Sequence, residues 1–265
     1  MLRSIDHIVI VVPELIPAME DFGRAGFAVI PGGEHADGLT HNALIVLADG
    51  SYLELIAFKS QDIPPAHQWA AWHQRGSGLV AFALLSDDLA TDAGAWRERG
   101  LPVAGPRDGG RQRPDGQTLA WSTVIFAAPD GQAMPLPFVI QDATPRALRV
   151  PAESATQHRL PVRRVAGVTV AVRNLALWSR TYADLLGQPG TQGISAHSLR
   201  FDIGGQWILL ASAGQSESDL GRYVDACGEG IYEVTLAGGP STTLLLHDAR
   251  LRIESAQQAK GVGGH

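Results

Sequence analysis

A spacing that occurs three times restricts the fold of this 265-residue chain more than any other feature. In each copy, an apolar run with the character of a buried strand leads into a helical pattern that ends at a glycine. The start of the run and the glycine are 21 residues apart in all three copies, which are Ile5 to Gly26, Leu79 to Gly100 and Ala166 to Gly187. Similarity at a fixed period predicts a modular fold.

The first copy has the element order β-α-β-β-β. We expect strands at 5–12, 27–30, 41–48 and 51–58, a helix at 14–25 and a glycine-rich loop at 31–40. Asp49-Gly50 is a strong hairpin signal between the last two strands. The second copy repeats this order, with strands at 79–85, 118–127 and 134–140, a helix at 88–99, a long loop before residue 118 and a second hairpin turn at Asp130-Gly131.

These units predict an α+β protein of repeated βαβββ modules. Two modules fill residues 1–141, and a segment at 142–164 with three prolines is the expected linker. Residues 165–255 hold a degenerate third module and a partial fourth, and 256–265 form a tail. Outside the modules, 62–75 is expected to be helical. Its Trp69 and Trp72, like Trp121 and Trp207 elsewhere, are expected to lie in the core rather than to stack on a ligand.

Composition excludes several classes of protein. The net charge is -6 without a basic run, which argues against nucleic acid and against an anionic membrane surface as partners. No apolar stretch reaches the length of about 18 residues that a membrane span needs. We therefore expect a cytoplasmic protein. The single cysteine, Cys227, excludes a disulfide within the chain and any metal site with several cysteines.

Two polar residues interrupt apolar strands of the first module. His7 lies in the first strand and Glu54 in the last, and a buried imidazole or carboxylate needs a partner. A divalent metal is one shared explanation, because His and carboxylates are ligands of Zn, Fe, Mn, Ni and Co. A hydrogen-bonded core histidine and a solvent-facing glutamate are the alternatives.

Several strings in the first 140 residues resemble the glyoxalase-like domain family of the vicinal-oxygen-chelate superfamily. They are DHIVI at 6–10, THNALI at 40–45, DGSYLELI at 49–56, RPDGQ at 113–117 with Trp121, and LPF at 136–138. The resemblance implies cupped mixed β-sheets, with helices packed outside, around one divalent metal ion. It places His7 and Glu54 on ligand positions.

The sequence departs from the pattern of this superfamily, in which each of two modules supplies two ligands. At the position of His7, the second module has Ala81 and the third has Gly167 or Val168. At the position of Glu54, they have Pro135 and Leu209. The remaining ligands would come from His41, His35, His73 or His158, from water or from substrate oxygens. A site with only two protein ligands, His7 and Glu54, is equally compatible with a cup that binds no metal.

Further candidates surround this half site. His41 opens a strand after the glycine-rich loop and is a candidate third metal ligand or general base, with Glu54 as the other catalytic candidate. Asn42 is a candidate for orienting a substrate. Arg111 and Arg113, in the long loop of the second module, are candidates for holding its carboxylate or phosphate; a solvated loop charge is the alternative.

Two functions follow as hypotheses. The first is a metal-dependent enzyme of the lyase, isomerase or dioxygenase type that acts on a small oxygenated metabolite. The second is a non-catalytic protein of the same fold that binds or sequesters a small molecule without metal. A third reading is a structural or interaction protein with a filled cup. A homodimer is expected by analogy with other proteins built from βαβββ modules.

Overall fold

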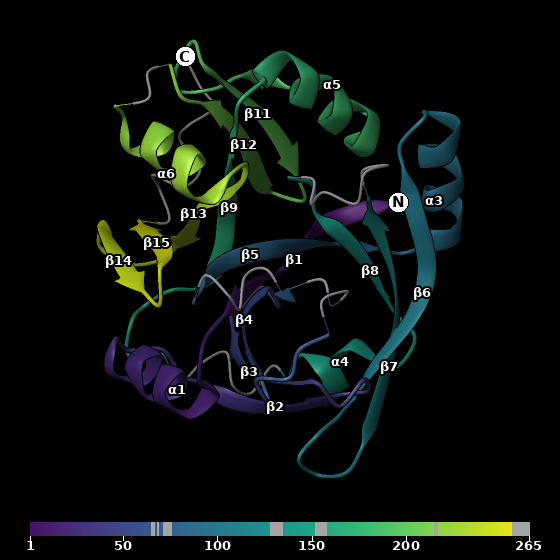
Figure 1. Ribbon diagram of the computed structural model, residues 1–265, viewed down its shortest axis with the longest axis vertical. Helices are drawn as coiled ribbons and strands as arrows, with labels where there is room; N and C mark the ends of the chain where they lie inside the picture. Colours follow the sequence, from purple (N-terminus) through teal and green to yellow (C-terminus); the bar gives the residue numbers. More distant parts are fainter. Residues whose placement is uncertain are drawn as a thin grey trace.

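The computed structural model describes residues 1–64, 67, 69–70, 76–127, 135–151, 158–214 and 217–255. Eight strands of the first two modules form a closed barrel in the order β1-β4-β3-β2-β6-β7-β8-β5. They are β1 (Leu2–Val11), β2 (Ile30–His35), β3 (Thr40–Val46), β4 (Tyr52–Phe58), β5 (Gly78–Ser86), β6 (Val103–Gln112), β7 (Thr118–Phe126) and β8 (Phe138–Asp142). Helices α1 (Leu15–Arg24) and α3 (Leu89–Glu98) lie outside the barrel (Figure 1).

The pairing of β1 with β5 has the register expected of two copies of one module. In this antiparallel pair, His7 lies opposite Ala83 and Val9 lies opposite Ala81. With the 74-residue offset between the modules, His7 corresponds to Ala81 and Val9 to Ala83. Exchanging the two modules therefore turns the pair His7–Ala83 into the pair Ala81–Val9. The repeat predicted from the spacing is thus also a repeat of the structure.

The third and fourth copies form an open sheet of seven strands in the order β10-β11-β12-β9-β13-β15-β14. Its strands are β9 (Arg164–Val172), β10 (Thr191–Gln192), β11 (Ser198–Ile203), β12 (Gln206–Ser212), β13 (Gly230–Ala237), β14 (Thr242–Leu246) and β15 (Ala249–Glu254). Helices α5 (Leu175–Leu186) and α6 (Asp219–Cys227) belong to this part, which lies in the upper half of Figure 1.

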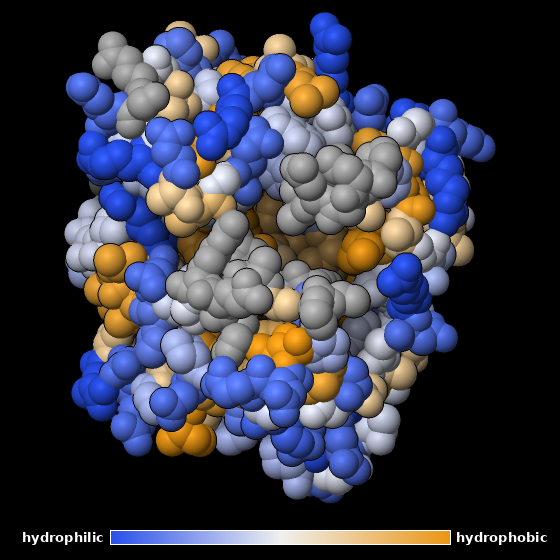
Figure 2. Space-filling view, in the orientation of Figure 1, coloured by the Kyte–Doolittle hydropathy of each residue, from blue (hydrophilic) through white to orange (hydrophobic). Residues whose placement is uncertain are grey.

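Alternation along β1 separates the core from the barrel interior. Ile8, Ile10 and Val12 belong to the main apolar core, which also contains Val168 and Val170 of β9. Successive side chains of a strand point to opposite faces, so His7 faces away from this core. The predicted α+β architecture of βαβββ modules is confirmed, and the view in Figure 2 shows apolar residues around a central hollow on a mainly hydrophilic face.

Two segments expected to be loops are strands that close the barrel. β2 runs from Ile30 to His35 where a loop at 31–40 was expected, and β6 occupies the long loop of the second module. They pair through Glu34 with Gln112 and His35 with Arg111. The contact is so close that a Cβ atom at Gly33 would lie 1.9 Å from the backbone oxygen of Gln112. Glycine thus serves close strand packing here, not a loop.

The expected linker contains a short helix, α4 (Arg146–Arg149). The Asp130-Gly131 turn, Trp72 and much of the expected helix at 62–75 lie outside the described residues. None of the helices in the described part of the chain has the length and hydropathy of a transmembrane segment.

Candidate functional site

An irregularity in β1 joins His7 to its neighbour Asp6. The register of β1 with β5 shifts between Ile5 and His7, which makes Asp6 the extra residue of a β-bulge. The Nδ1 atom of His7 lies 2.6 Å from Asp6 Oδ2, and both side chains are buried. Because an ionised carboxylate only accepts hydrogen bonds, Nδ1 carries the proton that is donated to Asp6. This bond fixes the orientation of the imidazole ring.

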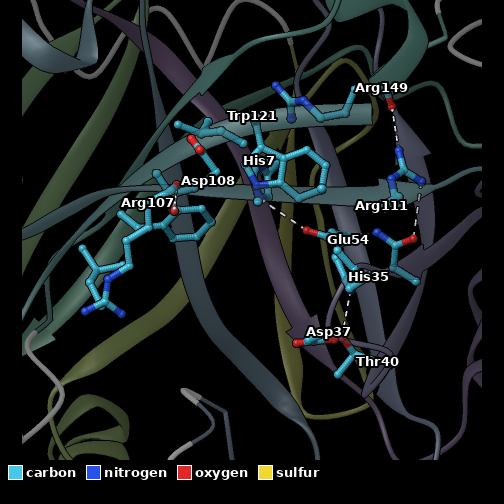
Figure 3. A pocket seen from close by; sticks show the side chains of 18 of the residues that line it. His7, His35, Asp37, Thr40, Glu54, Arg107, Asp108, Arg111, Trp121 and Arg149 are labelled. Carbon is cyan, nitrogen blue, oxygen red and sulfur yellow. Dashed lines mark hydrogen bonds and ion pairs between the residues drawn. The ribbon is translucent and has the colours of Figure 1, made fainter. Parts of the chain in front are cut away.

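The other ring nitrogen of His7 faces Glu54 on β4. His7 Nε2 lies 3.3 Å from Glu54 Oε2, and His35 Nε2 from β2 lies 3.5 Å from Glu54 Oε1 (Figure 3). Asn42 on β3 donates a hydrogen bond from its amide nitrogen to Glu54 Oε1. His35 Nδ1 in turn lies 2.8 Å from the hydroxyl of Thr40. Four strands thus place two imidazoles and an amide around one buried carboxylate.

Two arginines of α4 hold Asp6 on its other side. Arg149 donates to Asp6 Oδ2 at 2.8 Å and to the Tyr52 hydroxyl at 2.7 Å, while Arg146 is ion-paired with Asp6 Oδ1. The Tyr52 ring stacks on His7 with 4.6 Å between centroids. The linker between the two halves of the chain therefore supplies part of the site's support.

Both buried carboxylates are held ionised. Burial on its own raises the pKa of Asp6, but the Arg149 charge and the hydrogen bond from His7 hold it well below its usual value. Burial likewise opposes ionisation of Glu54; the hydrogen bond from His35, the nearby His7 and the Asn42 amide nevertheless lower its pKa to about 2. A carboxylate that stays charged in a buried site is available as a ligand or acceptor throughout the neutral range.

The depressed pKa of Glu54 predicts acid destabilisation. Its stabilising contribution is fully present above the ordinary value of 4.5 and is lost as pH falls toward about 2. The shift corresponds to about 3 kcal/mol. We expect the free energy of unfolding, measured by urea denaturation between pH 6 and pH 3, to fall more steeply for the wild type than for Glu54→Gln. Equal slopes for the two proteins would contradict the assignment.

The cluster forms part of the wall of a cavity of 540 Å³. This volume lies within the range of small-molecule sites, about 300–1,000 Å³. The polar part of the wall includes His7, His35, Asn42, Glu54 and Arg111, and the aromatic part includes Tyr52, Trp69, Trp121 and Phe138. Trp69 and Trp121, which the sequence assigned to the core, therefore line the cavity.

The structure brings together four of the six residues singled out from the sequence. His7, Glu54, Asn42 and Arg111 all line the cavity. His41 does not, because it is the neighbour of Asn42 in β3 and faces the opposite side of the strand, across from Glu34. The ligand or base role expected for His41 is thus not supported by its position; burial and the Lys59 charge lower its pKa.

Arg113 also lies outside the cavity wall. It donates to the backbone oxygen of Leu148 at 2.7 Å and pairs with Asp115 at 3.0 Å. Its side chain therefore holds α4 in place, and the expected contact with a substrate is not supported by its position.

Sequence reasoning missed Asp6 and Arg149, and it named His35 only among several further ligands. Asp6 precedes His7 directly, and strict alternation would have sent its side chain to the opposite face; only the bulge allows the two to meet. His35 was expected in a loop because Gly32, Gly33 and Gly38 lie close to it in the sequence.

The other ligand candidates do not join the cluster in the described residues. His158 bonds to backbone atoms of Ala28 and Val46, and His73 lies outside the described residues.

The second and third modules have no ionisable side chain at the equivalent positions. Glu54 pairs with Val9, and Phe138 of β8 pairs with Ala83, so Phe138 rather than Pro135 is the counterpart of Glu54. Its ring lies 5.3 Å from that of His7, edge on. In the third module, Leu209 pairs with Thr169, two residues after Gly167, just as Glu54 pairs with Val9, two residues after His7.

In the third module, Gly167 takes the place of His7 and Trp207 that of Tyr52. The indole lies so close that a Cβ atom at Gly167 would be 2.1 Å from it. Trp207 therefore occupies the space in which a ligand side chain would stand, and the third module has no counterpart of the His7 and Glu54 pair at these positions.

Both sheets are built from βαβββ modules, and a polar cluster lies in the cavity of the barrel formed by the first two modules. The sequence model of the glyoxalase-like domain matches residues 5–186, so the chain belongs to the glyoxalase-like domain family. No curated protein matches the sequence.

Solved structures share the fold at low sequence identity. A hypothetical protein from Staphylococcus aureus aligns with a TM-score of 0.76 and 14% identity over 96% of this chain and 100% of its own. A mutant of 4-hydroxymandelate synthase from Streptomyces coelicolor aligns with a TM-score of 0.62 and 15% identity, over 89% of this chain and 71% of its own. A xylose isomerase-like TIM barrel/4-hydroxyphenylpyruvate dioxygenase fusion protein aligns with a TM-score of 0.53 and 16% identity, over 89% of this chain and 36% of its own.

The donor atoms suit a divalent ion in part. Bonds from zinc to nitrogen and oxygen are about 2.0–2.2 Å long, which puts neighbouring ligands of one ion roughly 3.0–3.4 Å apart. The distance of 3.3 Å from His7 Nε2 to Glu54 Oε2 fits this spacing. Within the described ranges, no three or more His, Cys, Asp or Glu side chains form a complete metal group. The arrangement suits two protein ligands with further positions open to water or substrate oxygens.

Proposed function

We propose that this glyoxalase-like protein is a divalent-metal-dependent enzyme, of the lyase, isomerase or dioxygenase type, that acts on a small oxygenated molecule in the barrel cavity. The observation that carries the proposal is the approach of His7 Nε2 to Glu54 Oε2 in the cavity wall, with His7 Nδ1 bound to buried Asp6. A carboxylate behind a histidine ligand is a frequent second layer of metal sites, because it fixes the ring and raises its basicity.

Each side chain then has a definite task. His7 and Glu54 would hold the ion, and Asp6 orients His7. When bound, a divalent ion supplies a Lewis acid that polarises substrate oxygens and stabilises developing negative charge. His35, 3.5 Å from Glu54 and bonded to Thr40, takes over the role first expected of His41, as further ligand or as the group that accepts a substrate proton.

Elemental analysis of the purified protein tests the proposal. We expect about one divalent ion per chain in the wild type and in His41→Ala, whose side chain lies outside the cavity, and loss of the ion in His7→Ala and Glu54→Ala. Full metal content in His7→Ala, or no ion in the wild type after incubation with Zn, Mn, Fe or Ni, would falsify this assignment.

A metal-free binding protein is the second candidate. It is favoured by the apolar replacement of the ligands in the second module, where Phe138 stands at the position of Glu54. Ligand binding that is unchanged by a chelator, in a protein without metal, would identify this function instead.

A further inference from the structure

Two arginines are buried beside the cavity, and they differ in how their charges are compensated. Arg149 is 2% exposed and pairs with two carboxylates, Asp6 and Asp142, as well as the Tyr52 hydroxyl. Arg111 is 3% exposed, yet among the described residues no carboxylate lies within 4.0 Å of its guanidinium. A buried charge without a counter-ion is costly, so its retention needs an explanation.

The hydrogen bonds of Arg111 leave most of its donors for another partner. Its guanidinium donates to Asn42 Oδ1 at 3.4 Å and to the backbone oxygen of Arg149 at 3.1 Å (Figure 3). A guanidinium has five N–H donors in a planar fork that matches carboxylate and phosphate. Two neutral acceptors, one of them at the long distance of 3.4 Å, therefore satisfy only a part of this group.

Burial lowers the pKa of Arg111 more than the nearby charge of Glu54 raises it, and Glu54 makes no direct ion pair with the guanidinium. The Oε1 atom of Glu54 accepts from Asn42 and lies beside His35, while Oε2 faces His7. Asn42 stands between Glu54 and Arg111 and bonds to both. Asn42 thus fills the space between the two charged groups, and a Cβ atom at Gly32 would collide with both Asn42 and Arg111.

The rest of the wall is suited to an apolar or aromatic body. Trp121 packs edge-on to His35 and Phe138 edge-on to His7, and Ile125 and Ile140 also line the cavity. Flat apolar side chains in a concave site stabilise a ring by contact and by excluding water.

We propose that the ligand of this cavity is a small anion whose acid group, a carboxylate or a phosphate, binds the guanidinium of Arg111 and whose apolar ring packs against Trp121 and Phe138. The inference rests on the proposed function in taking this cavity as the ligand site, and it adds the substrate class. The acid group supplies the direct ion pair that Arg111 does not make within the described part of the chain, in bidentate hydrogen bonds.

Titration calorimetry with three matched probes tests the proposal: phenylacetate, phenyl phosphate and the neutral phenylacetamide. We expect the wild type to bind at least one of the two anions at least tenfold more tightly than the amide. Arg111→Met should lose this preference, and Arg113→Met should keep it because Arg113 lies outside the wall. Which anion binds more tightly identifies the acid group.

Arg111→Lys keeps the positive charge but lacks the planar fork of the guanidinium. It provides a second test of the site if Arg111→Met fails to fold. It should retain a reduced preference for the anion. Binding of neither anion to the wild type at millimolar concentration, or the same preference in Arg111→Met as in the wild type, overturns the proposal.

Repeating the titrations after chelation separates this inference from the metal proposal. An Arg111-dependent preference that survives in chelated, metal-free protein supports the anion site even if the metal proposal fails. A protein that holds metal through His7 and Glu54 but does not distinguish the anions from the amide overturns the anion site alone.

Discussion

Arg149→Met is expected to lower the free energy of unfolding by about 3–5 kcal/mol, the usual cost of removing one partner of a buried ion pair. Arg149 donates to Asp142 through two nitrogens, at 2.6 and 2.9 Å, and to Asp6 at 2.8 Å. Without it, Asp6 remains fully buried with part of its charge uncompensated. Urea denaturation at pH 7, with circular dichroism as the signal, measures the loss.

Arg146→Met is the matched control. Arg146 belongs to the same helix and also pairs with Asp6, but its side chain is 33% exposed. Water compensates part of its loss, so we expect about 1–2 kcal/mol. The double variant Asp6→Asn, Arg149→Met should be more stable than the sum of the single losses predicts, because it leaves no unpaired charge. A loss below about 1 kcal/mol for Arg149→Met would show that the ion pair is not needed for stability.

The position of His7 and Glu54 could be predicted because both interrupt apolar strands. Alternation in β1 assigns His7 to the face opposite Ile8 and Ile10, and the module order brings β4 beside β1. The parallel pair of these strands sets Glu54 opposite Val9, two residues from His7. Local pattern and repeat therefore determine the meeting of these two side chains, although the role of the pair stays a prediction.

The rest of the site depends on features without periodicity. β2 and β6 contain glycines and charged residues instead of alternating apolar ones, and they become strands because each closes the barrel against the other. Helix α4 has one turn and follows a proline, so its arginines were assigned to a linker. Asp6 reaches His7 only through the bulge. Long-range pairing decided these features, and a single sequence does not record it.

Trp96→Ala is expected to cost about 3–5 kcal/mol of stability, as is usual when a buried tryptophan is truncated. Trp96 of α3 is 2% exposed and packs edge-on against Phe126 of the barrel, 5.3 Å between centroids. Its indole nitrogen donates to the backbone oxygen of Leu185 in α5 at 2.8 Å. One side chain thus contributes apolar contact to the barrel and a hydrogen bond to the helix of the third module.

Trp96→Phe separates the two contributions. It keeps most of the apolar contact but leaves the Leu185 oxygen without this donor, so we expect a loss of about 1–3 kcal/mol from the hydrogen bond and the smaller ring. Trp121→Ala is the control for tryptophan content, since this partly exposed residue lines the cavity and should cost less than Trp96→Ala. Thermal and urea unfolding of the three variants measure these differences. Equal losses for Trp96→Ala and Trp121→Ala would contradict the role of Trp96, whereas a clear loss in Trp96→Phe, which removes the bond to Leu185, would mean that the helix of the third module stabilises the barrel that holds the site.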